Sequence, residues 1–127
     1  MTVEYLQLED LLQLASDLGD LVVRDLGLLE AAVQRPRTTL YGQEAYPGIA
    51  HKAAVLLESL TRNHALIDGN KRLGWLAAVV FLDLNGLTLD APDDDAYDLV
   101  IAVSTGALDY TAAALRLKGW IEPIAGA

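Results

Sequence analysis

The sequence predicts one all-α domain, residues 1–127, made of about six helices packed around a buried central helix. Three observations favour this fold class. Apolar residues recur at helical spacing along most of the chain, and residues 73–84 are apolar almost without interruption. Helix-capping and helix-breaking residues separate these stretches. No repeat, linker or low-complexity stretch divides the chain, so a single core is expected.

The first three helices are expected at about residues 8–18, 25–35 and 49–62. Gly19 ends the first, Asp25 can cap the second and Pro36 stops it. The apolar stripe of the third helix predicts a core-facing side, with the polar residues outside it. These outward residues are His51, Lys52, Glu58 and Ser59.

The fourth helix, roughly residues 70–84, is apolar nearly all round, which is typical of a central helix enclosed by others. Asn85 and Gly86 supply its C-terminal cap. Pro92 and the acidic residues 93–95 start a fifth helix that ends near Gly106, and Asp109 caps a sixth. Residues 119–127 have no periodicity; Trp120 and Ile121 are expected to pack on the core or on a partner.

Composition excludes several classes of protein. With 53% hydrophobic and 21% charged residues, the chain is globular rather than disordered. A net charge of −9 argues against a general nucleic-acid binder and suits a basic protein partner. The chain contains no cysteine and two histidines, which rules out disulfides and thiolate metal sites and disfavours a zinc site.

A cytoplasmic location is expected. Residues 1–4 lack the basic and apolar blocks of a signal peptide. The longest apolar run is too short to span a bilayer and is interrupted by Asp83, so no membrane association is expected.

Residues 64–72 carry the densest chemistry: a histidine, a carboxylate, a Gly-Asn turn and two cations ahead of the apolar fourth helix. Free N–H groups at a helix start form an anion site, to which Lys71 and Arg72 add charge. Asp68 can hold a divalent cation that bridges phosphates, and His64 is the natural general base. The combination suits transfer of a phosphate-containing group from a nucleotide to a hydroxyl.

Each of these residues has an ordinary structural interpretation as well. A lone histidine is usually a hydrogen-bonded structural residue, a Lys-Arg pair is usually solvated, and Asp-Gly-Asn is usually a turn. Their concurrence favours function, because two cations at a helix N-terminus oppose the helix dipole unless an anion binds there.

The stretch from Arg62 to Arg72 resembles the Fic/Doc motif, in which a histidine is followed by an acidic residue, Gly or Ala, Asn and a basic pair. The Lys71-Arg72 ending resembles the death-on-curing (Doc) toxin branch. Fic members usually have Gly where Lys71 stands and a second Arg where Trp75 stands. Leu66 occupies the position of the family's usual aromatic anchor.

The resemblance implies a role for each motif residue. His64 would take the proton from a target Ser or Thr hydroxyl, and Asp68 would bind Mg²⁺ at the phosphates of ATP. Gly69 would permit the tight turn, while Arg72 would act in catalysis by neutralising the transferred group. The nucleotide- and phosphate-binding residues would be Gly69, Asn70, Lys71 and Arg72.

The resemblance also implies a function. Doc-like toxins of type II toxin–antitoxin systems move the γ-phosphate of ATP onto a threonine of elongation factor Tu, which blocks protein synthesis. Fic-like relatives transfer AMP instead, and a non-catalytic nucleotide- or peptide-binding module is a further alternative. The Fic inhibitory pattern, Ser or Thr with Glu four residues later and then Gly or Asn, does not occur in the sequence. Control is therefore expected from a cognate small antitoxin.

Two other segments need interpretation. Residues 37–48 are a surface connection by default, but the equivalent segment in Fic/Doc proteins is a β-hairpin flap that pairs with the target's extended chain. The target-positioning residues would then be Gly42, Gln43, Glu44 and Tyr46. Residues 24–30 also resemble a stretch frequent in Doc-like proteins; a capped core helix accounts for this stretch, and no chemistry is assigned to it.

Overall fold

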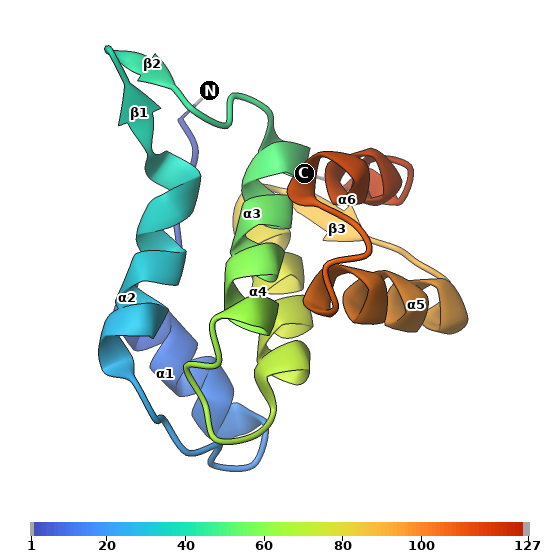
Figure 1. Ribbon diagram of the computed structural model, residues 1–127. Helices are drawn as coiled ribbons and strands as arrows, with labels where there is room; N and C mark the ends of the chain where they lie inside the picture. The colour runs from blue at the N-terminus through green and yellow to red at the C-terminus, as the bar shows by residue number, and fades with distance from the viewer. Residues whose placement is uncertain (1, 126–127) are drawn as a thin grey trace.

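A computed structural model describes residues 2–125, which form six α-helices, one 3-10 turn and four short strands (Figure 1). The helices are α1 (Leu8–Asp17), α2 (Leu26–Gln34), α3 (Ile49–Arg62), α4 (Asn70–Leu84), α5 (Asp93–Ser104) and α6 (Tyr110–Lys118). The turn η1 is Arg35–Arg37, and the strands are β1 (Thr39–Leu40), β2 (Gln43–Glu44), β3 (Leu87–Leu89) and β4 (Ile121–Pro123).

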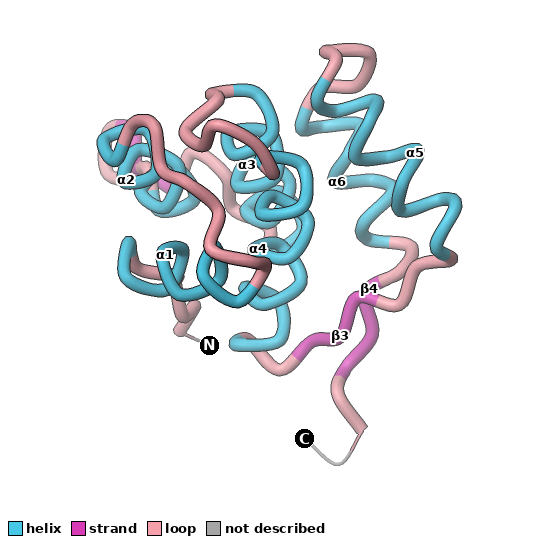
Figure 2. The backbone as a smooth tube through the Cα atoms, turned by 90° about the horizontal axis from the view of Figure 1, so that it is seen from below, coloured by secondary structure: helices cyan, strands magenta, loops and turns pink. Residues whose placement is uncertain are grey.

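The helices pair into three layers, with α3 and α4 between α1 and α2 on one side and α5 and α6 on the other (Figure 2). The all-α class and the approximate helix bounds predicted from the sequence are confirmed. Two predicted caps are present as well: the Asp25 carboxylate accepts the Leu28 N–H at 3.2 Å, and Asp109 accepts the Ala112 N–H at 2.9 Å.

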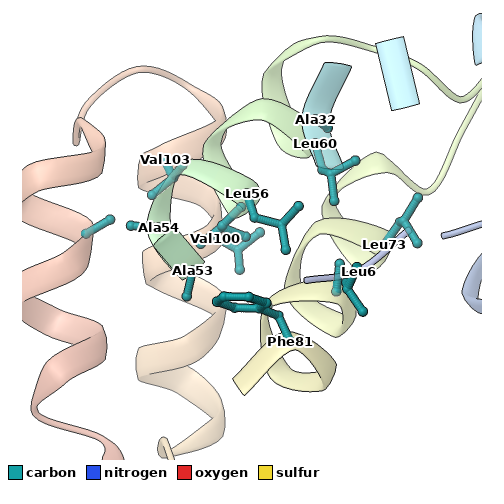
Figure 3. Close-up of a cluster of buried hydrophobic side chains, with 14 of the residues drawn as sticks. Leu6, Ala32, Ala53, Ala54, Leu56, Leu60, Leu73, Phe81, Val100 and Val103 are labelled. Carbon is teal, nitrogen blue, oxygen red and sulfur yellow. The ribbon is translucent and has the colours of Figure 1, made fainter. Parts of the chain in front are cut away.

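The helix at the centre is α3 as much as α4, although the sequence pointed to the fourth helix alone. Ten of the 14 residues of α3 are buried, against six of 15 in α4, whose Trp75 and Val79 are half-buried. Gly74 lets the two helices approach closely, because a Cβ there would lie 2.8 Å from the Thr61 methyl group. Leucines of α3, together with Leu73 and Phe81 of α4, meet valines of α5 in the core (Figure 3).

Two charged residues of α3 were placed outside the core by their pattern, and that prediction is wrong. Lys52 is 1% exposed and donates from Nζ to the carbonyls of Tyr46 at 2.6 Å and Pro36 at 3.2 Å. Glu58 is 8% exposed and pairs with Arg35 at 2.9 Å. Periodicity records polarity but not available partners, and a buried charge is tolerated where its hydrogen bonds are satisfied.

Residues 39–44 form the β-hairpin that the family resemblance suggested. Thr39 pairs with Glu44 and Leu40 with Gln43. Tyr41 and Gly42 make the turn with φ of +53° and +77°, the pattern of a type I′ hairpin. Figure 1 shows the hairpin and the loop of residues 63–69 at opposite ends of α3.

The C-terminal segment does more than pack on the core. Residues 121–123 pair antiparallel with residues 87–89, with Thr88 opposite Glu122. The Trp120 carbonyl accepts the Asp90 N–H at 2.9 Å, and the Trp120 ring packs against the core. Three-residue strands are too short to give a period-two signal, so this pairing was not predicted.

No helix within residues 2–125 combines the length and the apolar character that crossing a membrane requires.

Candidate functional site

The loop of residues 63–69 joins α3 to α4 and lies along the segment between α1 and α2. Ile67 donates its N–H to the Val22 carbonyl at 3.0 Å, and Val23 and Leu66 form an antiparallel bridge. The Ala65 carbonyl accepts the N–H groups of Arg24 at 2.7 Å and Asp25 at 3.0 Å. The first half of the motif is therefore held by main-chain hydrogen bonds to a distant part of the sequence.

His64 is an exposed residue of this loop, and its backbone has a φ of +54°. A left-handed backbone at a residue other than glycine costs about 1–3 kcal/mol and is retained where surrounding contacts impose it. Ala65 and Leu66, 0% and 1% exposed, anchor the next two positions in the core. Leucine therefore serves the anchoring function that the family resemblance assigns to an aromatic residue at this position.

Two asparagine side chains close the loop. Asn70 accepts the Leu66 N–H and donates to the Leu66 carbonyl, both at 3.0 Å. Asn63 donates to the Leu28 carbonyl at 3.0 Å and accepts the Ala65 N–H at 3.2 Å. One amide proton of Asn70 remains for a ligand, so the loop contact is compatible with the phosphate contact that the resemblance implies.

Gly69 is the N-cap of α4, with φ of +90°. A Cβ at this position would lie 2.6 Å from one Leu21 methyl group and 2.9 Å from the other, closer than side chains pack. Position 69 therefore requires glycine for two reasons, its backbone conformation and its contact with Leu21.

The start of α4 has the features of an anion site. The N–H groups of Asn70, Lys71 and Arg72 lie in the first helical turn, where no earlier helical carbonyl is available, and Gly69 has no side chain to cap them. Lys71 and Arg72 are both exposed. Arg72 folds back toward the cap, with Nη2 3.3 Å from the position of a Cβ on Gly69. Main-chain donors and the guanidinium of Arg72 thus meet at one point.

Asp68 lies at the edge of this anion site. Its Oδ1 accepts the Gly69 N–H at 2.8 Å, and its carboxylate is exposed. Within residues 2–125 no group of three or more His, Cys, Asp or Glu side chains is arranged to hold a metal. One carboxylate beside a phosphate site nevertheless fits Mg²⁺, which commonly binds one or two carboxylates together with substrate phosphates and water.

The residues predicted to position a target lie elsewhere. Gly42, Gln43 and Glu44 belong to the hairpin beyond the N-terminus of α3, whereas His64 follows its C-terminus. A 14-residue helix separates them, which is about 20 Å at 1.5 Å per residue. Tyr46 lies outside the hairpin and packs its ring against Tyr110, with the centroids 5.3 Å apart.

A groove of about 600 Å³ lies between α2 and the C-terminal half of α3. It is lined at one end by Leu28 and Asn63, near the motif, and at the other by Arg35 and Thr38, below the hairpin. Burial on its own lowers the pKa of Arg35, but hydrogen bonds and charge from Tyr46 and Glu58 outweigh it, so the pKa is raised. Arg35 therefore remains a cation in this groove.

The second histidine, His51, is half-buried near the start of α3, with its ring centroid 6.3 Å from that of Tyr110. It lies at the opposite end of α3 from His64. The motif therefore contains one histidine, and His51 belongs to a different part of the molecule.

Comparisons with known proteins identify the family of this chain. The model of the Fic/DOC family matches residues 4–82. The chain belongs to this family. It is also 51% identical over 121 residues to "Toxin Doc" of Mycolicibacterium smegmatis (strain ATCC 700084 / mc(2)155), covering 92% of this chain and 93% of that protein. The family match includes the motif and ends within α4, so α5, α6 and the β3–β4 pair lie outside it.

In this Fic/DOC protein, sequence reasoning missed Arg24 and the side-chain role of Asn63. Both act on the motif through long-range hydrogen bonds, Asn63 to α2 and Arg24 to the His64 carbonyl. The available signal was the resemblance of residues 24–30 to a stretch of Doc-like proteins, but a helix cap already accounted for that stretch.

Gly69→Ala is expected to destabilise the protein more than Gly106→Ala does. Both glycines have positive φ, +90° and +84°, but a Cβ at position 106 meets nothing within 4 Å. Gly106→Ala, the matched control, should lower the free energy of unfolding by about 1 kcal/mol because of its backbone conformation. Gly69→Ala should cost about 1–3 kcal/mol more, because its methyl group overlaps Leu21. Urea unfolding measures both.

The double variant Leu21→Ala/Gly69→Ala isolates the cause, since removing the Leu21 methyl groups should recover much of the additional cost of the alanine. Equal destabilisation by Gly69→Ala and Gly106→Ala would show that Leu21 does not constrain the loop.

Proposed function

We propose that this Fic/DOC protein is a toxin of a type II toxin–antitoxin system that acts as a protein Ser/Thr kinase. It would transfer the γ-phosphate of ATP to a hydroxyl of a translation factor resembling elongation factor Tu, and so block protein synthesis. The observation that carries the proposal is an exposed His64, held with a left-handed backbone on the loop that leads into the cationic N-terminus of α4. The relative named as a Doc toxin supports it.

The proposed reaction assigns a task to each motif residue. His64 accepts the proton of the Ser or Thr hydroxyl, and the hydroxyl oxygen forms a bond to the γ-phosphorus. The bond from that phosphorus to the β–γ bridging oxygen breaks, ADP leaves, and His64 releases its proton to solvent. Lys71, Arg72 and the α4 amides neutralise the charge on the transferred group, where phosphoryl transfer gains most of its rate.

Mg²⁺ is proposed as the cofactor together with ATP, and Asp68 is the carboxylate that would hold it. When bound, the ion would offset part of the negative charge of the phosphates. Asp68 suits this task because its carboxylate is exposed beside the anion site and has one oxygen committed to the Gly69 N–H.

Phosphoryl transfer is favoured over adenylyl transfer by two positions. Lys71 stands where Fic members have glycine, so its side chain fills space that a phosphate tail would occupy. Trp75 stands where they have a second Arg, and it lines an apolar groove of about 420 Å³ between α4 and α5. Without that second cation the outer phosphates are not held in the Fic orientation, and the γ-phosphate can lie beside His64.

The hairpin remains the proposed target-positioning element, acting at a distance. Leu40 and Tyr41 at its tip are exposed, and a short two-stranded edge can accept another strand. A target chain paired there would reach His64 after about six or seven extended residues, at 3.3 Å each. The groove between α2 and α3 offers a path for that chain.

The group transferred is tested by incubating the protein with cell extract and ATP labelled at the α- or the γ-phosphate. We expect label from the γ position alone, on a threonine of one abundant protein. His64→Ala should abolish labelling with the thermal melt unchanged, because His64 is exposed. His51→Ala is the matched control and should label at the wild-type rate.

Label from the α position would replace the kinase proposal by AMP transfer. No label from either position, with nucleotide binding intact, would identify a non-catalytic nucleotide-binding module.

The cofactor is tested by titrating Mg²⁺ against activity in wild type and Asp68→Ala. We expect Asp68→Ala to lower the rate about 100-fold, which corresponds to about 3 kcal/mol in activation free energy, and to respond more weakly to Mg²⁺. Asp83→Ala, an exposed carboxylate near the C-terminus of α4, is the control and should behave as wild type. An unchanged Mg²⁺ response in Asp68→Ala would exclude Asp68 as the magnesium ligand.

A small antitoxin is the proposed partner, and the target would place both proteins in the cytoplasm. The groove between α4 and α5 suits an amphipathic helix, because Trp75 and the 68%-exposed Tyr97 line it beside Lys71 and Arg72. The product of the adjacent small gene should co-purify with the protein, and Tyr97→Asp should weaken the complex. Leu115→Asp, at another exposed apolar residue, should not. Harmless expression of the protein alone in its native host would contradict the toxin proposal.

A further inference from the structure

We propose that Arg24 is a positioning residue for His64. The guanidinium of Arg24 donates from Nε to the His64 carbonyl at 2.8 Å, and its Nη2 donates to the same oxygen. Forty positions separate the two residues in the sequence, and Arg24 lies in the segment between α1 and α2. The arginine therefore holds the backbone of the proposed general base without belonging to the motif.

The main chain of Arg24 acts on the next residue of the loop. Its N–H donates to the Ala65 carbonyl at 2.7 Å, while its side chain holds the carbonyl of His64. One residue thus fixes two consecutive peptide planes, those that follow His64 and Ala65. Because the backbone of His64 is left-handed, with φ of +54°, it needs such contacts to remain in place.

The chemistry of the side chain fits this task. A guanidinium presents several N–H donors in a rigid plane, so two of them can meet one carbonyl oxygen, whereas a lysine ammonium has no such fork. Asp25, the adjacent carboxylate, caps α2 through Leu28. Within residues 2–125 Arg24 forms no ion pair, and its directed hydrogen bonds go to the motif.

The exposure of Arg24 and His64 distinguishes a role in positioning His64 from a role in the stability of the fold. Arg24 and His64 are both exposed, and a hydrogen bond that exchanges with water makes a modest net contribution to global stability. The effect of Arg24 is therefore local. It sets the direction of the His64 imidazole relative to the anion site at Gly69 and Arg72. Misplacing a catalytic group by about 1 Å can cost about 100-fold in rate.

The experiment compares wild type with Arg24→Ala, Arg24→Lys and the control Arg116→Ala, an exposed arginine on α6. The kinetic measurement rests on the proposed transfer to protein hydroxyls and gives kcat and the KM for ATP. A second measurement does not depend on activity: the ¹³Cα and ¹³Cβ chemical shifts of His64, which report its backbone conformation, together with the melting temperature.

We expect Arg24→Ala to lower kcat about 100-fold, with the KM for ATP and the melting temperature close to wild type. Its His64 carbon shifts should move away from the left-handed values. Arg24→Lys should fall between Arg24→Ala and wild type, and Arg116→Ala should match wild type in every measurement.

Unchanged His64 shifts in Arg24→Ala would overturn the proposal, whatever the kinetics. A raised KM for ATP with kcat unchanged would overturn it in favour of direct nucleotide binding by Arg24. If the wild type transfers no phosphate but the His64 shifts move in Arg24→Ala, the proposed function fails while the positioning of His64 by Arg24 stands.

Discussion

The structure depends on how the short loop between α3 and α4 is held. These two helices supply much of the core, so their ends are fixed by packing, yet the loop must leave the first amides of α4 open to a ligand. Asn70 resolves this by binding both polar groups of the Leu66 backbone with its side chain. The loop is thus held by a side chain of the motif itself. Gly69, the N-cap of α4, has no side chain and leaves the helix N-terminus uncovered.

The two ends of α3 have different chemistry. At its C-terminal end, polar groups face solvent beside an anion site. At its N-terminal end, Lys52 satisfies the carbonyls that lead into and out of the hairpin and pairs with Glu44 at 3.0 Å. A charge so enclosed holds the base of the hairpin rather than binding a ligand. The groove between α2 and the C-terminal half of α3 lies between these ends, with Arg35 and Glu58 paired within it.

Much of the fold was predictable because its signals are local. Asp25 and Asp109 cap the helices they were expected to cap, and the apolar stripes place most helix faces correctly. The failures concern long-range partners. The buried Glu58 pairs with Arg35, 23 positions away, and β3 pairs with β4 with Leu89 opposite Ile121. Neither contact can be predicted from the pattern of apolar residues in its own segment.

The sequence by itself determined the helices, the family resemblance and the set of motif residues, because spacing along the chain encodes caps, stripes and the order of a nine-residue motif. Only the tertiary structure decided how those residues are held. Arg24 meets His64 across 40 positions, and the hairpin lies a helix length away from that histidine. Both facts depend on how segments pack in space, since a hydrogen bond between distant residues is formed by the fold and not by their separation in the chain.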